Sequence, residues 1–265
     1  MKFRAVIAAA ALTAGIAHAS SQDPSAPAFD ADRALRLSQA AIGRALDPAL
    51  TFTDETGRRR SLAEFRGRPL VISPIYTSCF GVCPTTTTEL RKVAEIASAV
   101  LGPESFRVLT IGFDTANDTS ERMNSFAASR GTFPAGWVFG AADAAAAARL
   151  LADIGFTYAA TPKGFDHMIQ ATIVDAEGVV FRQVYGQQIE PPQLVDPLKR
   201  LALGQKAGED TLGAMIEGVR LFCTVFDPKS GRYRFDWSIV LSFVIGVLCF
   251  TAVAAFLWRS WFRSA

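Results

Sequence analysis

The chain has 265 residues, of which 50% are hydrophobic and 20% are charged, so it can bury the core of one ordinary domain with residues to spare. Its formal net charge is only +2. Surfaces that bind nucleic acid are usually strongly basic, so this balance speaks against a DNA- or RNA-binding role.

The first residues have the three parts of a secretory signal peptide. Lys2 and Arg4 precede a short apolar run at 5–16, and the sequence Ala-His-Ala at 17–19 matches an A-x-A cleavage site. An uncleaved anchor is the alternative, but the apolar run is too short to cross a bilayer. We therefore expect residues 1–19 to be removed during export.

The next stretch leads into the expected folded domain. Residues 20–49 contain Ala, Pro and Ser, and we expect a tether there with one short helix near 32–46. The domain is predicted to span residues 50–204. A strand at 51–53 and a turn at 54–57 indicate that it opens with a hairpin.

A continuous apolar run at 70–76 predicts a strand that is buried on both faces, as in a parallel sheet. A helix is expected at 85–101, where apolar residues recur at helical spacing and Gly-Pro at 102–103 ends the pattern. A second central strand is expected at 106–113. The polar loop at 114–119 then lies at the carboxyl end of that strand.

The rest of the predicted domain alternates helices with strands. The expected elements are a helix at 120–130 capped by Ser120, a strand at 137–139, a helix at 142–154, a hairpin of strands at 169–175 and 179–185, and a helix at 192–203. This order predicts an α/β fold, a mixed sheet flanked by helices. Sites in such sheets form at the carboxyl ends of the parallel strands.

The C-terminal part of the sequence predicts a membrane anchor. Residues 237–258 carry no charge and have Trp at both ends, and Arg259 and Arg263 follow. This is the pattern of a single transmembrane helix. We expect a membrane-proximal connector at 205–236, the helix at 237–258, and a cytoplasmic tail at 259–265. The main domain is then on the periplasmic side of a bacterial inner membrane.

Two cysteines lie where the first central strand gives way to a helix. Cys79 and Cys83 are four residues apart, a spacing that serves a structural disulfide, a redox pair or a pair of soft-metal ligands. The helix N-terminus is expected to lower the pKa of Cys83. Of the other cysteines, Cys249 lies in the predicted span, and Cys223 is expected to be a buried or membrane-proximal thiol.

The exported part of the chain keeps one histidine, His167, in an expected loop directly before a predicted strand. If that strand neighbours the first central strand, His167 reaches the thiol loop. Two thiolates and an imidazole suit Cu(I), and they hold Cu(II) with a further oxygen ligand. From the residues alone, a ligand role and a structural role for His167 remain equally open. Met168 is expected in the core, and Asp114 and Asp118 in a helix-capping loop.

Several ordered motifs accompany these residues. Tyr-Thr-x-Cys-x-x-x-Cys-Pro at 76–84 and Asp-His at 166–167 resemble motifs of the Sco/SenC family of thioredoxin-like copper-binding proteins. Further stretches that resemble the family are found at 57–67, 113–119 and 173–178. The resemblance covers residues 51–203.

The resemblance implies a thioredoxin-like fold and copper bound by Cys79, Cys83 and His167. It also implies a role in assembling the CuA site of cytochrome c oxidase subunit II, by copper delivery, by reduction of its cysteines, or both. Three features depart from the family pattern: Phe80 follows the first cysteine in place of Pro, Thr115 replaces another Pro, and the expected anchor is C-terminal.

We therefore expect a membrane-anchored copper metallochaperone, a transfer protein without turnover. The alternative is an enzyme, a thiol-disulfide oxidoreductase that uses Cys79 and Cys83 as its redox pair. The spacing is one residue longer than Cys-x-x-Cys, and Asp166 and His167 occupy the stretch where thioredoxins carry a cis-proline; both features favour metal. A peroxiredoxin-like peroxidase ranks last because the spacing from Pro74 to Cys79 is too short.

Overall fold

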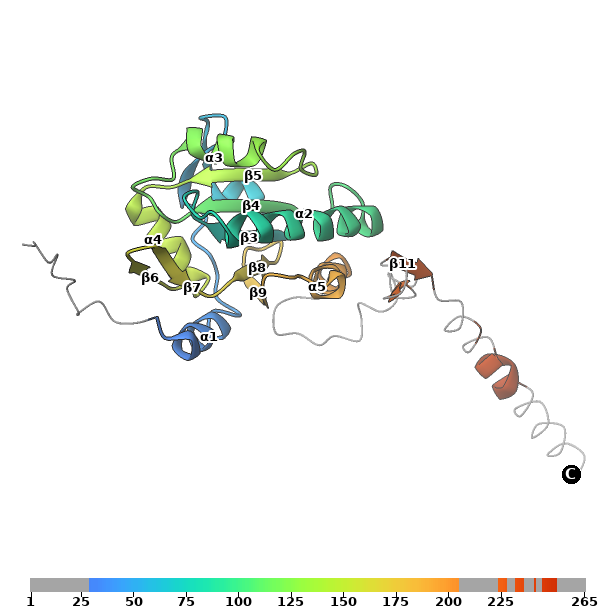
Figure 1. The fold of residues 1–265 in the computed structure, drawn as a ribbon. Helices are drawn as coiled ribbons and strands as arrows, with labels where there is room; N and C mark the ends of the chain where they lie inside the picture. The colour runs from blue at the N-terminus through green and yellow to red at the C-terminus, as the bar shows by residue number, and fades with distance from the viewer. Residues whose placement is uncertain (1–28, 205–223, 228–231, 236–240, 242–244, 252–265) are drawn as a thin grey trace, which may run out of the picture.

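A seven-stranded mixed sheet forms the centre of the structure, a computed structural model (Figure 1). It describes residues 29–204, 224–227, 232–235, 241 and 245–251. In spatial order the strands are β2 (Arg59–Ser61), β1 (Thr51–Asp54), β5 (Trp137–Ala141), β4 (Arg107–Gly112), β3 (Leu70–Ile75), β8 (Gln170–Val174) and β9 (Val180–Tyr185). Strands β3, β4 and β5 run parallel, and the outer pairings are antiparallel. The predicted α/β mixed sheet is confirmed.

Strand β3 is buried along its whole length. All six of its residues are buried. It pairs with β4 from Leu70 to Ile75, and with β8 only from Leu70 to Ile72. Pro74, which has no N–H to donate, lies beyond the last residue paired with β8, where a missing donor is tolerated. Because side chains on both faces of β3 are buried, the sequence of this strand is almost entirely apolar.

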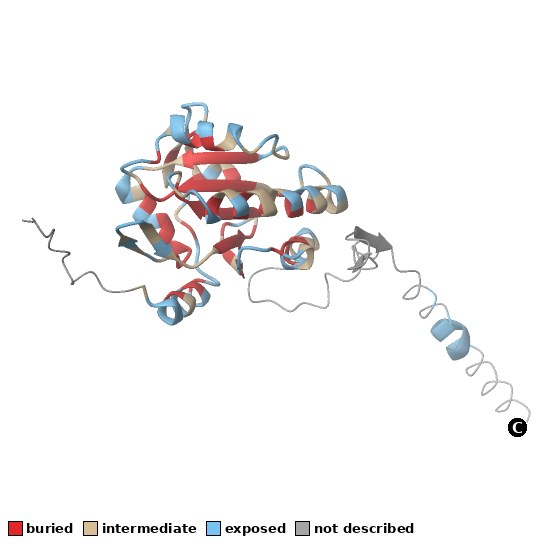
Figure 2. Ribbon diagram, in the orientation of Figure 1, coloured by how far each residue is buried: buried red, intermediate tan, exposed pale blue. Residues whose placement is uncertain are grey.

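Helices cover the sheet, and their buried stripes complete one hydrophobic core. The longest is α2 (Val82–Leu101), in which Leu90, Val93 and Ala97 join the same core cluster as the strands. The others are α3 (Ser120–Ala128), α4 (Ala144–Asp153), α5 (Pro191–Ala202) and the 3₁₀ turn η1 (Leu62–Phe65). Figure 2 shows the strands buried and the outer helix faces exposed.

Residues 30–49, expected within a tether, are folded onto the domain. Helix α1 (Ala31–Gln39) is shorter than the predicted helix and is capped by Asp30, whose carboxylate accepts from Arg33 N–H. Ala41 and Leu46 beyond it are buried. The packed domain therefore begins near residue 30 and not at 50. Small apolar side chains make this contact, which is why the sequence pattern did not reveal it.

A buried polar network fixes α1 against the sheet. The Gln183 amide nitrogen donates to the carbonyls of Ser38 at 3.1 Å and Ile154 at 3.0 Å. Its oxygen accepts from the Thr172 hydroxyl at 2.7 Å and the Gln170 amide at 3.1 Å. One side chain of β9 thus connects α1, the end of α4 and β8.

Two local expectations were wrong. The region before β8 was expected to be a loop, but it forms a separate two-stranded sheet of β6 (Tyr158–Thr161) and β7 (Gly164–His167). Thr119, not Ser120, caps α3, because its hydroxyl accepts from Arg122 N–H. The Ser120 hydroxyl donates instead to the Asp54 carbonyl of β1.

Beyond residue 204 the structure describes only short pieces. β10 (Thr224–Asp227) and β11 (Arg232–Phe235) form an antiparallel hairpin within the expected connector. Most of the predicted span at 237–258 lies outside the described residues, as does the predicted signal peptide at 1–19. Within the described segments, no helix has the length and apolar character needed to cross a bilayer.

Replacing the hub of the polar network is expected to weaken the fold. Gln183→Ala removes four hydrogen bonds from a buried place, so the free energy of unfolding should fall by about 1–3 kcal/mol. Gln188→Ala, at an exposed position of the following turn, is the matched control and should change it by less than about 0.5 kcal/mol. Urea unfolding of both variants makes the comparison; equal losses would contradict the role of the network.

Candidate metal and thiol site

The two cysteines lie at the carboxyl end of β3, and they are arranged unequally. Helix α2 begins at Val82, three residues before the predicted start, so Cys83 is in its first turn. The N–H of Cys83 donates to the Cys79 sulfur at 3.3 Å. Cys79 is half-buried, whereas the Cys83 side chain is only 2% exposed. The N–H group at the start of α2 therefore donates to the sulfur of Cys79 and not to that of Cys83.

This arrangement reverses the expected acidity of the pair. Burial acts to raise the pKa of Cys79, but hydrogen bonds from the N–H groups of Cys83 and Gly81 outweigh it, and the pKa is lowered. Burial raises the pKa of Cys83 to about 12, and the neighbouring Cys79 sulfur adds to the rise. The prediction of a lowered pKa at Cys83 was wrong, because the helix start buries that thiol and directs its amide at the other sulfur.

Tyr76 links the thiol loop to the hairpin of β6 and β7. Its hydroxyl interacts with Cys79 and with the backbone of Phe165. Gly164 allows this approach, since a Cβ there would lie 2.9 Å from the hydroxyl oxygen, and its φ of +124° also favours glycine. Burial, followed by the contact with Cys79, raises the pKa of Tyr76 to about 12. The phenol therefore stays protonated and can donate to the sulfur.

His167 ends β7 and faces a group of aromatic rings. Its ring centroid is 6.0 Å from that of Tyr76, 5.4 Å from that of Phe113 and 5.5 Å from that of Phe156. The Nδ1 atom is 3.0 Å from the Met168 carbonyl. A carbonyl only accepts, so Nδ1 carries the proton and Nε2 keeps a lone pair. Burial lowers the pKa of His167, so the imidazole is neutral at pH 7, the form that binds metals.

The structure brings the predicted residues to one end of the sheet but does not close them into one site. Cys79 and Cys83 contact each other, and His167 is connected to them through the Tyr76 side chain. In the part of the chain that the structure describes, no three His, Cys, Asp or Glu side chains are close enough to hold a metal ion. Strand β8 does lie beside β3, as the sequence argument for His167 required.

Asp118 was expected only to belong to a helix-capping loop, but it also binds the thiol loop. Its carboxylate accepts from Thr77 N–H at 2.8 Å, from the Thr77 hydroxyl at 2.6 Å and from Asp114 N–H at 2.9 Å. Burial raises its pKa, and these three bonds offset part of that rise. Asp118 therefore ties the loop after β4 to the thiol loop. Asp166 is exposed and does not hold Nδ1 of His167, since the Met168 carbonyl does.

Sequence reasoning missed the aromatic surroundings of His167. Phe156 precedes the unpredicted hairpin, and Tyr158 and Phe165 lie on its two strands. Tyr76 belongs to the cysteine motif, which does not reveal its contact with the His167 ring. The abundance of aromatic residues between 156 and 167 was the available signal.

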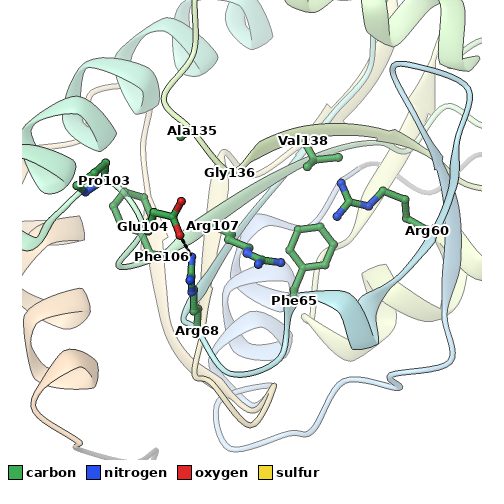
Figure 3. Close-up of a pocket in the computed structure, with 10 residues that line it drawn as sticks. All are labelled: Arg60, Phe65, Arg68, Pro103, Glu104, Phe106, Arg107, Ala135, Gly136 and Val138. Atoms are coloured by element: carbon green, nitrogen blue, oxygen red, sulfur yellow. Dashed lines mark hydrogen bonds and ion pairs between the residues drawn. The ribbon is translucent and has the colours of Figure 1, made fainter.

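A pocket of about 200 Å³ lies at the opposite end of the sheet, near the starts of β4 and β5 (Figure 3). Arg60, Arg68 and Arg107 line it. Arg68 is paired with Glu104, and Arg60 is paired with carboxylates outside the pocket. Much of the positive charge is thus balanced, and we assign this pocket no ligand.

Comparisons with known proteins identify the family. The model of the SCO1/SenC family matches residues 39–203, more than half of the chain. The chain belongs to the SCO1/SenC family. A search of curated proteins found no significant match.

Solved structures agree with this SCO1/SenC assignment. A putative electron transfer protein from Aquifex aeolicus VF5 is 28% identical, with a TM-score of 0.57 over 63% of this chain and 97% of that one. Bradyrhizobium japonicum ScoI, solved with copper bound, is 22% identical, with a TM-score of 0.50 over 59% and 99%. A SCO1/SenC lipoprotein from Bacillus anthracis str. Ames is 18% identical, with a TM-score of 0.54 over 61% and 96%. The thioredoxin-like fold is confirmed.

The unequal thiols should differ in reactivity. In the reduced protein at pH 7–8, iodoacetamide is expected to label Cys79 first, since it is partly exposed and its pKa is lowered, while Cys83 is protected by burial and by its raised pKa. Peptide mapping by mass spectrometry gives the two rates. In urea the rates should converge, which serves as the control. Equal labelling of the folded protein would contradict the arrangement.

Proposed function

We propose that this SCO1/SenC protein is a copper metallochaperone. It binds copper through the thiolates of Cys79 and Cys83 and Nε2 of His167, and it passes the metal to the CuA site of cytochrome c oxidase subunit II. The observation that supports it best is the meeting of a contacting thiol pair and a neutral histidine with a free Nε2 at one end of the sheet. Soft sulfur ligands with one imidazole favour Cu(I).

Binding requires a local rearrangement. Tyr76 lies between the thiols and the imidazole, so its side chain or the hairpin that carries His167 has to move to close the site. The hairpin is suited to such a shift, because β6 and β7 pair with each other and not with the main sheet. The thiol loop stays fixed meanwhile by its bonds to Asp118.

The proposed location of the site comes from the sequence alone. The predicted signal peptide and the predicted single span at 237–258 would put the domain on the periplasmic side of a bacterial inner membrane. The proposed acceptor, the CuA domain of subunit II, would then share that compartment with the donor. The protein would act by transfer, with copper as its cargo.

A thiol-disulfide oxidoreductase is the second candidate, and one observation favours it. Cys79 has the lowered pKa and partial exposure of an attacking thiol, while Cys83 is buried behind it in the place of a resolving thiol. The two functions need different residues. Thiol exchange should survive His167→Ala, whereas tight copper binding should not.

Copper titration of the full-length reduced chain tests the ligand set. Wild type should bind one Cu(I) tightly; Cys79→Ser and Cys83→Ser should abolish tight binding, and His167→Ala should weaken it by at least about tenfold. Met168→Leu removes the neighbouring soft sulfur, and Cys249→Ser removes a thiol far along the chain; both controls should bind as wild type does. Unchanged affinity in His167→Ala would overturn the ligand assignment.

Copper affinity should also depend on pH in a stated direction. The Cys83 thiol, with a pKa of about 12, must lose its proton to bind, so protons compete with the metal and affinity should rise as the pH is raised from 6 to 8. Burial lowers the pKa of His167, which reduces its contribution to this dependence. Competition with a chelator of known affinity at each pH measures it. An affinity that falls as the pH rises would contradict the role of Cys83.

A further inference from the structure

Phe80 is the most exposed apolar side chain in the folded domain. It directly follows Cys79, and its side chain is 100% exposed. Within residues 29–204 the structure describes five exposed large apolar side chains: Leu37, Ile42, Phe80, Val82 and Tyr158. Leu37 and Ile42 belong to the α1 region, whereas the other three border the thiol site.

The stretch of sequence around Phe80 is uncharged. The sequence from Pro69 to Thr88 contains no charged residue. Val82 follows on the same loop, at the first position of α2. On the other side of the site, Tyr158 pairs with His167 across the hairpin and contacts the Phe113 ring at a centroid distance of 4.8 Å. An apolar rim formed by Phe80, Val82 and Tyr158 therefore borders the site from two directions.

We propose that Phe80 is a docking anchor that inserts into an apolar pocket beside the cysteines of the copper acceptor. The inference rests on the proposed function, and it names the part of this chain that recognises the partner. Transfer of copper by ligand exchange requires an acceptor sulfur to reach the metal held by Cys79. Phe80 is the next residue, so an acceptor that comes this close also covers its side chain.

The energetics favour this position for an anchor. Burying a phenylalanine side chain removes a large apolar area from water, and aromatic residues at the centre of an interface carry much of the binding energy. The loop that carries Phe80 brings no charged side chain of its own into the contact. The rim selects a partner with a neutral, apolar surface around its thiols and disfavours one whose thiols are ringed by charge.

Copper transfer from the full-length chain to a reduced, copper-free CuA domain tests the anchor. Phe80→Ala should raise the acceptor concentration for half-maximal rate about tenfold, and leave the copper affinity and the rate at saturation unchanged. Phe80→Leu, which keeps apolar bulk, should recover part of the loss. Ile42→Ala, at an exposed apolar position of the α1 region, is the matched control and should transfer as wild type does.

The other outcomes separate this inference from the function on which it rests. If wild type transfers copper and Phe80→Ala transfers equally well, the anchor is overturned and the metallochaperone function stands. A loss of copper affinity in Phe80→Ala would also overturn it, since Phe80 would then act on the metal site. If Phe80→Ala instead loses binding to lipid vesicles, or self-association, with normal transfer, the exposed ring serves a membrane or a second copy. Wild type that transfers no copper overturns the function and the anchor together.

Discussion

The side chain of Tyr76 is the constraint on which the geometry of the site depends. It follows a strand that is buried along its whole length, its hydroxyl lies against Cys79 and the backbone of β7, and its ring packs against that of His167. The phenol therefore lies between the thiol loop and the hairpin and keeps Cys79 apart from His167. Under the proposed copper-binding function, this side chain or the hairpin has to move before the three residues can hold one metal ion.

The helix start then gives the two thiols different chemistry. Because α2 begins at Val82, its first amides point at Cys79, and the thiol of Cys83 is enclosed by the core. Cys79 is partly exposed with a lowered pKa, whereas Cys83 is buried with a raised pKa. This difference is compatible with metal exchange, in which ligands are replaced one at a time, and with disulfide exchange, in which one thiol attacks and the other resolves.

The sequence predicted the parts of the fold that depend on continuous patterns. The buried run of β3, the apolar stripe of α2 and the hairpin of β8 and β9 all formed where expected. The packing of α1 against the domain was not predictable from the sequence. It depends on buried alanines and on the Gln183 network, and α1 has no stripe of large apolar residues that would indicate a buried face. Strands β6 and β7 are short and none of their residues is fully buried, so they show no buried alternation.

For the site, the residue types were predictable and their states were not. The proximity of Cys79 and Cys83 followed from their spacing. Their opposite pKa shifts depend on where α2 begins, and this start differs by three residues from the predicted one. Whether His167 could reach the thiols depended on the pairing of β8 with β3, which the structure confirms. The aromatic rings around the imidazole depend on a hairpin that only the three-dimensional structure revealed.

The separate hairpin of β6 and β7 has a consequence for how a partner would recognise the proposed copper-loaded state. Since it is not part of the main sheet, the hairpin can shift while the rest of the domain stays the same. Tyr158, on its exposed face, would move with it. Under the proposed copper-transfer function, a partner that touches both Phe80 and Tyr158 would therefore distinguish the copper-loaded protein from the empty one, and the empty form would be released instead of competing for the acceptor.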